Sequence, residues 1–186
     1  MTSKVALRRQ QTQQSLETIA ARHFASKGTA AVSVEEIIAE AEVSRRTFYT
    51  FFANKHELIA AIVLPVFVDG LSQLQALEKQ HGDVLIEKII DTYLALWEQH
   101  RDAFYLSTQL DEKAFALVET QHNNFVHVLL NLLKIAEKAG TLKNKSADYS
   151  LKLIARSAVP ILKIYSADPQ SHSLYRETML GLLKKN

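Results

Sequence analysis

The 186-residue chain is 47% hydrophobic, which is enough to bury a sizeable core, and it contains only five Gly and three Pro. Because strong helix formers dominate and turn residues are scarce, an all-α fold is expected. The lack of cysteine excludes disulfides, thiolate metal sites and a cysteine nucleophile. The net charge is +2, and residues 1–60 carry eight basic and six acidic side chains, so charge alone does not indicate a nucleic-acid partner.

The N-terminus lacks the apolar segment of a signal peptide, and no run approaches the roughly 18 to 20 apolar residues of a membrane span. We therefore expect a cytoplasmic protein with no membrane partner. Residues 1–9 precede any periodic pattern and include Lys4, Arg8 and Arg9. They are predicted to form a mobile basic arm, which either contacts phosphates or is simply a frayed terminus.

Apolar residues recur at helical spacing from about 10 to 27 and predict a first helix, which Gly28 ends. His23 lies on its apolar stripe and is interpreted as a hydrogen-bonded core histidine rather than a ligand or catalytic group. Ser33 and Glu36 form a capping box at the start of a second helix. Ser44 is a good N-cap for a third helix.

The third helix has two contrasting faces. At 100° per residue, an aromatic arc of Phe48, Phe51 and Phe52 lies opposite Arg46 and Thr50. A helix anchored by aromatics on one side, with hydrogen-bonding side chains on the other, suits the major groove of DNA. The alternative is a small three-helix core with incidental surface arginines. The candidate DNA-binding residues are Ser33, Ser44, Arg45, Arg46, Thr47, Tyr49, Thr50 and Lys55.

From Leu16 to Leu58 the sequence resembles the DNA-binding domain of the TetR family of bacterial transcriptional regulators. The resemblance rests on FASKG at the end of the first helix, on AEVS at the turn and on FYTFFANKHEL after it. It implies that Ser33, Arg45, Arg46, Thr47, Tyr49 and Lys55 contact double-stranded DNA, and that a homodimer reads a palindromic operator. The family usually has Gly where this chain has Glu42. A non-Gly residue at positive φ costs about 1 kcal/mol, so the turn either avoids that conformation or loses stability.

A fourth helix is predicted from Lys55 to about residue 80, kinked by Pro65 and ended at His81-Gly82. Five further apolar stripes follow, the second of them a short helix over about 101–110, giving about nine helices. We expect a helix-turn-helix DNA-binding domain at 1–54 and a regulatory and dimerisation domain at 55–186. No Gly/Ser linker separates the two domains.

The C-terminal stripes allow two roles. An apolar pocket for a small apolar or amphipathic effector is predicted between helices, although plain core packing explains the same residues. Its predicted lining is Tyr93, Trp97, His100, Phe104, Tyr105, His122 and Phe125. The last two helices are expected to form the dimer interface, as in TetR-like proteins. The predicted interface residues are Leu151, Ile154, Ala155, Ala158, Leu162, Tyr175 and Leu182.

Two Glu-x-x-His units, Glu78 to His81 and Glu119 to His122, have the spacing used by di-iron bundles. The first abuts a helix end, and inward-facing Glu partners are not evident, so no metal, no cofactor and no enzymatic activity are expected. The function predicted is a DNA-binding transcriptional repressor that a small molecule releases from its operator. The alternative is a ligand-independent architectural DNA-binding protein with the same head.

Overall fold

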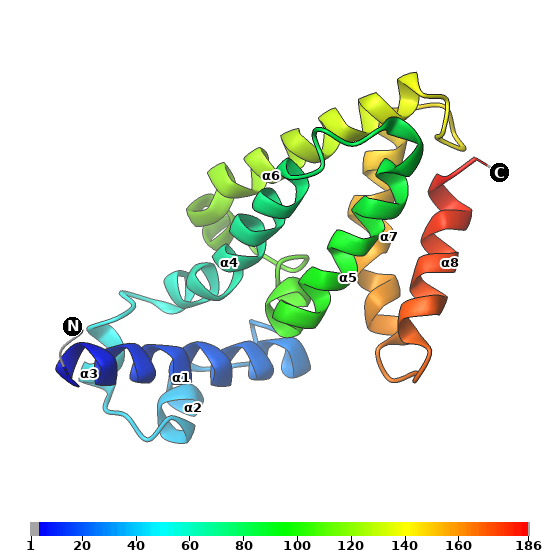
Figure 1. The fold of residues 1–186 in the computed structure, drawn as a ribbon. Coiled ribbons are helices and arrows are strands. Elements are labelled where there is room, and N and C mark those ends of the chain that lie inside the picture. The colour runs from blue at the N-terminus through cyan, green and yellow to red at the C-terminus, as the bar shows by residue number, and fades with distance from the viewer. Residues whose placement is uncertain (1–3, 186) are drawn as a thin grey trace.

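The computed structural model of the protein describes residues 4–185, and these form helices joined by short loops with no strand beyond an isolated bridge. Figure 1 shows α1 to α3 at one end of an elongated molecule and α5 to α8 in a body at the other. The helices are α1 Lys4–Lys27, α2 Val34–Glu40, α3 Arg45–Tyr49, α4 Lys55–Gln75, α5 Gly82–Leu106, α6 Glu112–Lys138, α7 Ala147–Tyr165 and α8 Ser171–Leu183. The all-α fold is confirmed.

The first helix begins earlier than predicted. Residues 4–9 belong to α1 rather than to a mobile arm, while residues 1–3 of the predicted arm lie outside the described part. No Gly or Pro interrupts Lys4–Lys27, and Ala, Leu, Arg and Gln in its first turns are strong helix formers. The helix ends as predicted at Gly28, whose φ is +81° and whose N–H donates to the Phe24 carbonyl at 2.9 Å.

The two short helices of the N-terminal domain have the predicted caps. Ser33 Oγ accepts from the Glu36 N–H at 3.2 Å, and Glu36 Oε2 accepts from the Ser33 N–H at 2.8 Å. This second bond is the main cause of the lowered pKa of Glu36. Ser44 Oγ accepts from the Thr47 N–H at 3.0 Å and caps α3.

Helix α4 lies at the centre of the molecule and packs against α1, α5 and α6. Contrary to expectation, it is long and apolar enough to cross a membrane by length and composition, with half of the relevant stretch buried inside the protein. A central core helix passes the same test, because it has three apolar neighbours to contact. It runs through Pro65 to Gln75, and Pro65 itself is exposed.

Gly82 does not end α4 as predicted. Helix α4 stops at Gln75, and Gly82 is the first residue of α5. A Cβ at Gly82 would lie 2.5 Å from Ala139 Cβ and 3.1 Å from the Ile135 carbonyl oxygen. The glycine is therefore explained by close approach to α6, which sequence periodicity does not reveal.

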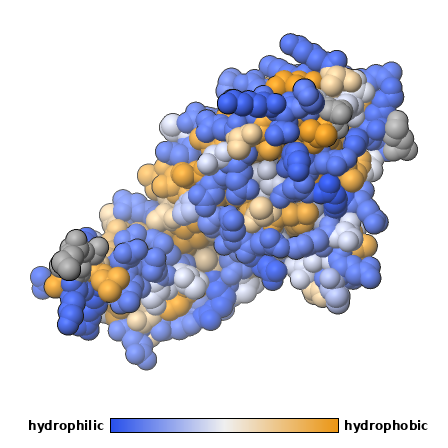
Figure 2. Space-filling model, viewed as in Figure 1, coloured by the Kyte–Doolittle hydropathy of each residue, from blue (hydrophilic) through white to orange (hydrophobic). Residues whose placement is uncertain are grey.

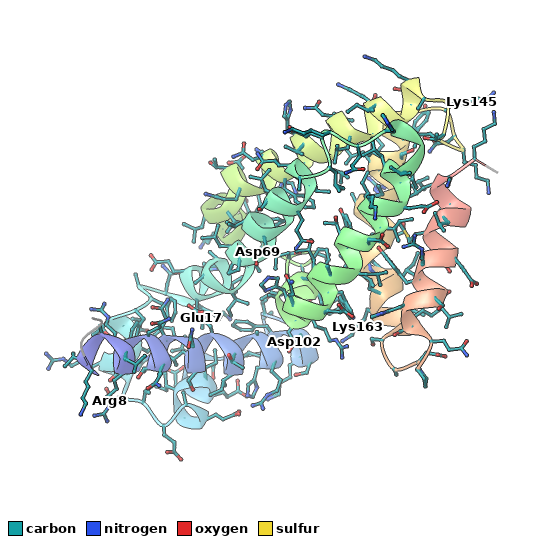
Figure 3. The ribbon with its side chains drawn as sticks, in the orientation of Figure 1. Arg8, Glu17, Asp69, Asp102, Lys145 and Lys163 are labelled. Carbon is teal, nitrogen blue, oxygen red and sulfur yellow. The ribbon has the colours of Figure 1, made fainter. Side chains whose placement is uncertain are left out.

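The predicted fifth and sixth helices are two segments of α5, so the described residues contain eight helices rather than nine. They meet at His100, whose φ of −134° and ψ of 31° are non-helical. His100 Nε2 lies 2.7 Å from Asp69 Oδ2 of α4, which ties the kink to the central helix. Figure 3 shows Asp69 on the side of α4 that faces α5.

The last helices close the body. Helix α6 ends at Lys138, two residues before Gly140 with its φ of +72°, and Ser146 caps α7, which continues through Pro160 to Tyr165. Helix α8 is held to α5 by Arg176, which pairs with Asp91 and Glu87, and Lys184 Nζ lies 2.5 Å from Glu87 Oε1. On the face drawn in Figure 2, hydrophobic residues gather over this body, whereas the N-terminal end is mostly hydrophilic.

Candidate DNA-binding surface and internal cavity

Aromatic rings line the inner side of α3 and of the turn that follows it. Phe48 and Phe52 are buried, with ring centroids 5.6 Å apart, and half-buried Phe51 lies 6.2 Å from Phe52. Together they fix α3 against the rest of the N-terminal domain. The predicted division of this segment into an aromatic inner side and a polar outer side is therefore present.

Two side chains on the outer side of α3, opposite the aromatic rings, are exposed to solvent. Arg46 is exposed and makes no hydrogen bond or ion pair with any residue that the structure describes. Tyr49 is 47% exposed, and its ring packs edge-on against Phe48 with centroids 5.3 Å apart. A guanidinium with five donors and a tyrosine hydroxyl on a rigid ring can contact base edges and phosphates.

The hydroxyl groups of α3 hold the helix itself. Ser44 Oγ lies 2.8 Å from Thr47 Oγ1, and Thr50 Oγ1 donates to the Thr47 carbonyl at 2.7 Å. These bonds leave oxygen lone pairs as acceptors. Among the predicted contacts, Ser44, Thr47 and Thr50 thus carry a demonstrable capping role, and their contact with DNA remains a prediction.

Arg45 and Lys55 already have partners. Arg45 pairs with Glu35 Oε1 of α2 at 2.6 Å, and both side chains are largely exposed, so the pair can exchange for a phosphate. Lys55 Nζ donates to the carbonyls of Thr29 and Val32 at 2.9 and 3.1 Å. The ammonium therefore fastens the loop that leads to Ser33, and its third N–H is left for an anion.

The turn between α2 and α3 adopts the strained conformation at Glu42, whose φ is +53°. The Glu42 N–H donates to the Ala39 carbonyl at 3.3 Å and the Val43 N–H to the Ile38 carbonyl at 3.1 Å. This pair of hydrogen bonds is a Schellman motif, which favours Gly at the position that Glu42 occupies. The turn therefore adopts the positive φ with its expected cost in conformational free energy, and it sets the direction in which the chain enters α3.

Arg9 is a neighbour of α3 that periodicity did not single out. Its guanidinium lies 5.4 Å from the centroid of the Phe51 ring. Figure 1 shows the N-terminal end of α1 beside α3, so the basic residues at the start of α1 lie on the same end of the molecule as Arg46. The unbroken helix propensity from Lys4 onward is the sequence signal that places Arg9 in α1.

A cavity of about 260 Å³ lies in the body, between α4, α5, α6 and α7. Four predicted pocket residues line it: Tyr93, Phe104, His122 and Phe125. The other lining residues are Phe67 of α4, Ser107 and Thr108 after the end of α5, Val126 and Leu129 of α6, and Leu151, Ile154, Ala155 and Val159 of α7. No Asp, Glu, Lys or Arg is among these described residues.

Three predicted pocket residues have other surroundings. Trp97 is buried, with the Arg101 guanidinium 5.7 Å from its ring centroid. His100 is paired with Asp69 at the kink. Tyr105 lies under Lys163 Nζ, 4.7 Å from its ring centroid. Residues of one apolar stripe point in several directions around the helix, and only those that point toward the cavity line it.

The predicted dimer residues differ in their surroundings within the single chain, and their role in a dimer stays a prediction. Ile154, Ala158, Leu162 and Tyr175 are buried within this chain. Leu151 and Ala155 line the cavity, as Ile154 does, and only Leu182 is an exposed large apolar residue. The exposed apolar side chains of α7 are instead Tyr149, Leu153 and Ile164, the last 73% exposed.

The described residues contain no group of three or more His, Cys, Asp or Glu side chains that could hold a metal ion. His122 lies with its ring against Phe67 and Phe115 rather than beside carboxylates. His23 Nε2 lies 2.6 Å from Glu40 Oε2, so it is hydrogen-bonded as predicted.

An aromatic-anchored third helix, set by a tight turn and carried on a larger helical body, defines a helix-turn-helix DNA-binding protein. Residues 18–62 match the sequence family described as bacterial regulatory proteins, tetR family. The chain is 29% identical over 87 residues to YvdT, an uncharacterised HTH-type transcriptional regulator of Bacillus subtilis (strain 168). That match spans 45% of this chain and 44% of YvdT, less than half of that relative.

Solved structures share the whole fold. The ketosteroid transcriptional regulator KstR2 of Mycobacterium tuberculosis has a TM-score of 0.75 and 16% identity over 94% of this chain and 95% of that chain. SmeT in complex with triclosan has a TM-score of 0.65 and 19% identity over 94% and 92%. SmeT is the repressor of the Stenotrophomonas maltophilia multidrug efflux pump SmeDEF. Residues 18–62 therefore match the DNA-binding domain of the tetR family, and the chain as a whole shares the fold of these solved regulators.

Proposed function

We propose that this protein is a repressor that binds a palindromic operator as a homodimer and is released when a small molecule occupies the cavity of its C-terminal body. One observation carries the proposal: α4 takes part in both regions. It begins at Lys55, which holds the loop before α2, and it contributes Phe67 to the cavity wall. These two residues are twelve positions apart, about 18 Å along a helix.

Two contacts support coupling between the cavity and the DNA-binding end. His56 Nε2 in the first turn of α4 lies 3.2 Å from Asp111 Oδ2, and the other oxygen of this carboxylate, Oδ1, caps α6. Further along, Phe125 of α6 packs against Gly70 of α4. A ligand that moves α6 therefore acts on α4 at both ends. The expected mechanism is a population shift toward a dimer whose α3 helices no longer fit successive major grooves.

The homodimer is proposed to form through the outer faces of α7 and α8. Tyr149, Leu153 and Ile164 of α7 and Leu182 of α8 are large apolar side chains that remain exposed in the single chain. A dimer would cover such a surface, and two copies of α7 and α8 together can form a four-helix bundle. The domain boundary at Lys55 and a cytoplasmic location are part of the same proposal.

The proposal is tested by recovering bound fragments from the genome of the source organism with purified protein and sequencing them. We expect a few enriched sites with two-fold symmetry and half-sites about one helical turn apart. Release of a recovered operator by a cavity ligand would support the repressor mechanism. Many sites without a common palindrome, and no release by bound ligand, would favour the architectural alternative instead.

A further inference from the structure

We propose that the cavity takes an uncharged, single-ring aromatic molecule that carries a hydroxyl group. The inference rests on the proposed function, because it names the chemical class of the effector. It is drawn from the size of the cavity, from the charge of its walls and from the hydrogen-bonding state of its four polar residues.

Size and charge limit the ligand first. A volume of about 260 Å³ lies just below the range typical of sites for drug-sized molecules, so the occupant is compact. None of the described lining residues is an acid, a lysine or an arginine. An ionised ligand would lose its hydration without gaining a counter-charge, which is costly, so the ligand is uncharged.

The walls favour an aromatic ring. Phe67 packs edge-on against His122, with centroids 5.4 Å apart and planes at 86°, and Phe125 lies 6.2 Å from both Phe67 and Tyr93. Tyr93 in turn lies 5.5 Å from Phe104. These rings hold one another in place and offer both faces and edges at the distances aromatic pairs prefer.

The polar groups of the wall are mostly acceptors. Ser107 Oγ and Thr108 Oγ1 donate their hydrogens to the carbonyls of Phe104 and Tyr105, both at 2.7 Å, and keep their lone pairs. His122 Nδ1 lies 3.2 Å from Asn123 Oδ1, and in the tautomer that donates to this oxygen His122 Nε2 is an acceptor. A ligand that donates a hydrogen bond can pair with these lone pairs, in competition with water at Thr108, which is exposed.

Tyr93 supplies the complementary donor. Its hydroxyl has no hydrogen-bond partner among the described residues, although the side chain is only 6% exposed. Burial raises the pKa of Tyr93, so the hydroxyl keeps its proton at neutral pH. A ligand hydroxyl, which both donates and accepts, matches one such donor and neighbouring acceptors, whereas an ether or a carboxylate does not.

The test compares three single-ring probes of similar size by isothermal titration calorimetry with the full chain in the absence of DNA. Thymol carries the hydroxyl, thymol methyl ether lacks the donor, and cuminate is an isopropyl-substituted benzoate anion of similar size. We expect thymol to bind roughly tenfold tighter than either of the others, because neither of them donates a hydrogen bond to the acceptors of the cavity wall. Equal affinity for the methyl ether, tighter binding of cuminate, or no binding of thymol would overturn the inference.

Two variants locate the effect. Tyr93→Phe removes only the donor hydroxyl, so it should weaken thymol and its methyl ether alike, because both ligand oxygens accept. His122→Leu removes the ring acceptor, so it should weaken thymol binding several-fold and leave the methyl ether nearly unchanged. Tyr105→Phe is the matched control, because this tyrosine of α5 lies under Lys163 Nζ and does not line the cavity. Unchanged thymol affinity in both cavity variants would also contradict the assignment. Because these titrations contain no DNA, thymol binding without operator release would contradict the proposed repressor mechanism while leaving the ligand class intact.

Discussion

Gly70 of α4 lies directly against the ring of Phe125 of α6. A Cβ at Gly70 would approach Phe125 Cε2 to 2.7 Å and Leu96 Cδ1 to 3.1 Å. Phe125 also lines the cavity. The glycine thus lets a wall residue from α6 touch α4, so the cavity contacts α4 both through Phe67 of α4 itself and through Phe125.

The substitution Gly70→Ala should lower the free energy of unfolding. Overpacking costs about 1 to 3 kcal/mol, and the better helix propensity of Ala offsets about 1 kcal/mol, so a net loss of up to about 2 kcal/mol is expected. Urea denaturation measures it. Gly181→Ala in α8 is the matched control, because an added Cβ there has no neighbour within 4 Å. That variant should gain about 0.5 to 1 kcal/mol, and the same gain at Gly70 would refute the close contact.

Glu42→Gly should stabilise the protein by about 1 kcal/mol, because glycine adopts the positive φ of the Schellman position without steric cost. Glu42→Ala keeps the Cβ and should show no such gain. Thermal unfolding of the two variants distinguishes conformational strain from loss of the charge. If both variants gain equally, strain at this turn is not the cause.

Local signals made part of the fold predictable. The capping box at Ser33, the cap at Ser44 and the glycine end at Gly28 depend on neighbouring residues only, and all three occur as expected. The predicted start of α1 near Gln10 is too late. The basic residues before Gln10 suggest an arm, but no residue there interrupts a helix. Gly82 was interpreted through its usual local role, whereas its actual reason is contact with Ala139.

Tertiary relationships could not be obtained from periodicity. The apolar residues of α7 share one helix, yet Ile154 faces the cavity, Ala158 is buried in the core and Ile164 is exposed. An apolar stripe shows that a side chain is covered but not by which element. The same limit explains why periodicity predicts Trp97, Tyr105 and Phe104 in one pocket. Of these three, only Phe104 lines the cavity.

Acid should weaken the attachment of α8 to α5. The ammonium of Lys184 beside Glu87 lowers the pKa of that carboxyl below 4.5 in the folded chain. A lowered folded-state pKa gives stability that is present above the unfolded pKa and is lost as the pH falls through the folded one. Glu87→Gln should therefore be less stable than the wild type at neutral pH, with the difference shrinking below about pH 4.5. Urea titrations across this range check it against Glu177→Gln of the same α8; a constant difference would contradict the linkage.

Ile164→Glu should dissociate the proposed dimer without harming the fold, because Ile164 is 73% exposed in the single chain. Light scattering coupled to size-exclusion chromatography gives the mass, and circular dichroism confirms that the helices remain. Leu117→Glu on α6, where Leu117 is 51% exposed, serves as the control and should remain dimeric. A dimer that persists in the Ile164 variant would place the interface elsewhere.

Lys55→Ala should weaken binding to all DNA sequences and reduce the dependence of affinity on salt, because a phosphate contact is lost. The variant also loses the two bonds from Lys55 Nζ to the loop carbonyls, so its melting temperature must be measured alongside. Arg46→Ala differs, because Arg46 has no partner to lose among the described residues.

Base recognition by α3 is tested by comparing the wild type with Arg46→Ala. Fluorescence anisotropy at one salt concentration gives the affinity of each protein for a recovered operator and for a scrambled duplex. Loss of one good base contact costs about 1 to 3 kcal/mol, so operator affinity should fall roughly tenfold to a hundredfold. Binding to the scrambled duplex should fall only a few-fold, and discrimination at one base position should relax. Equal losses on both duplexes would show that Arg46 contacts only the backbone and would contradict sequence reading by this face of α3.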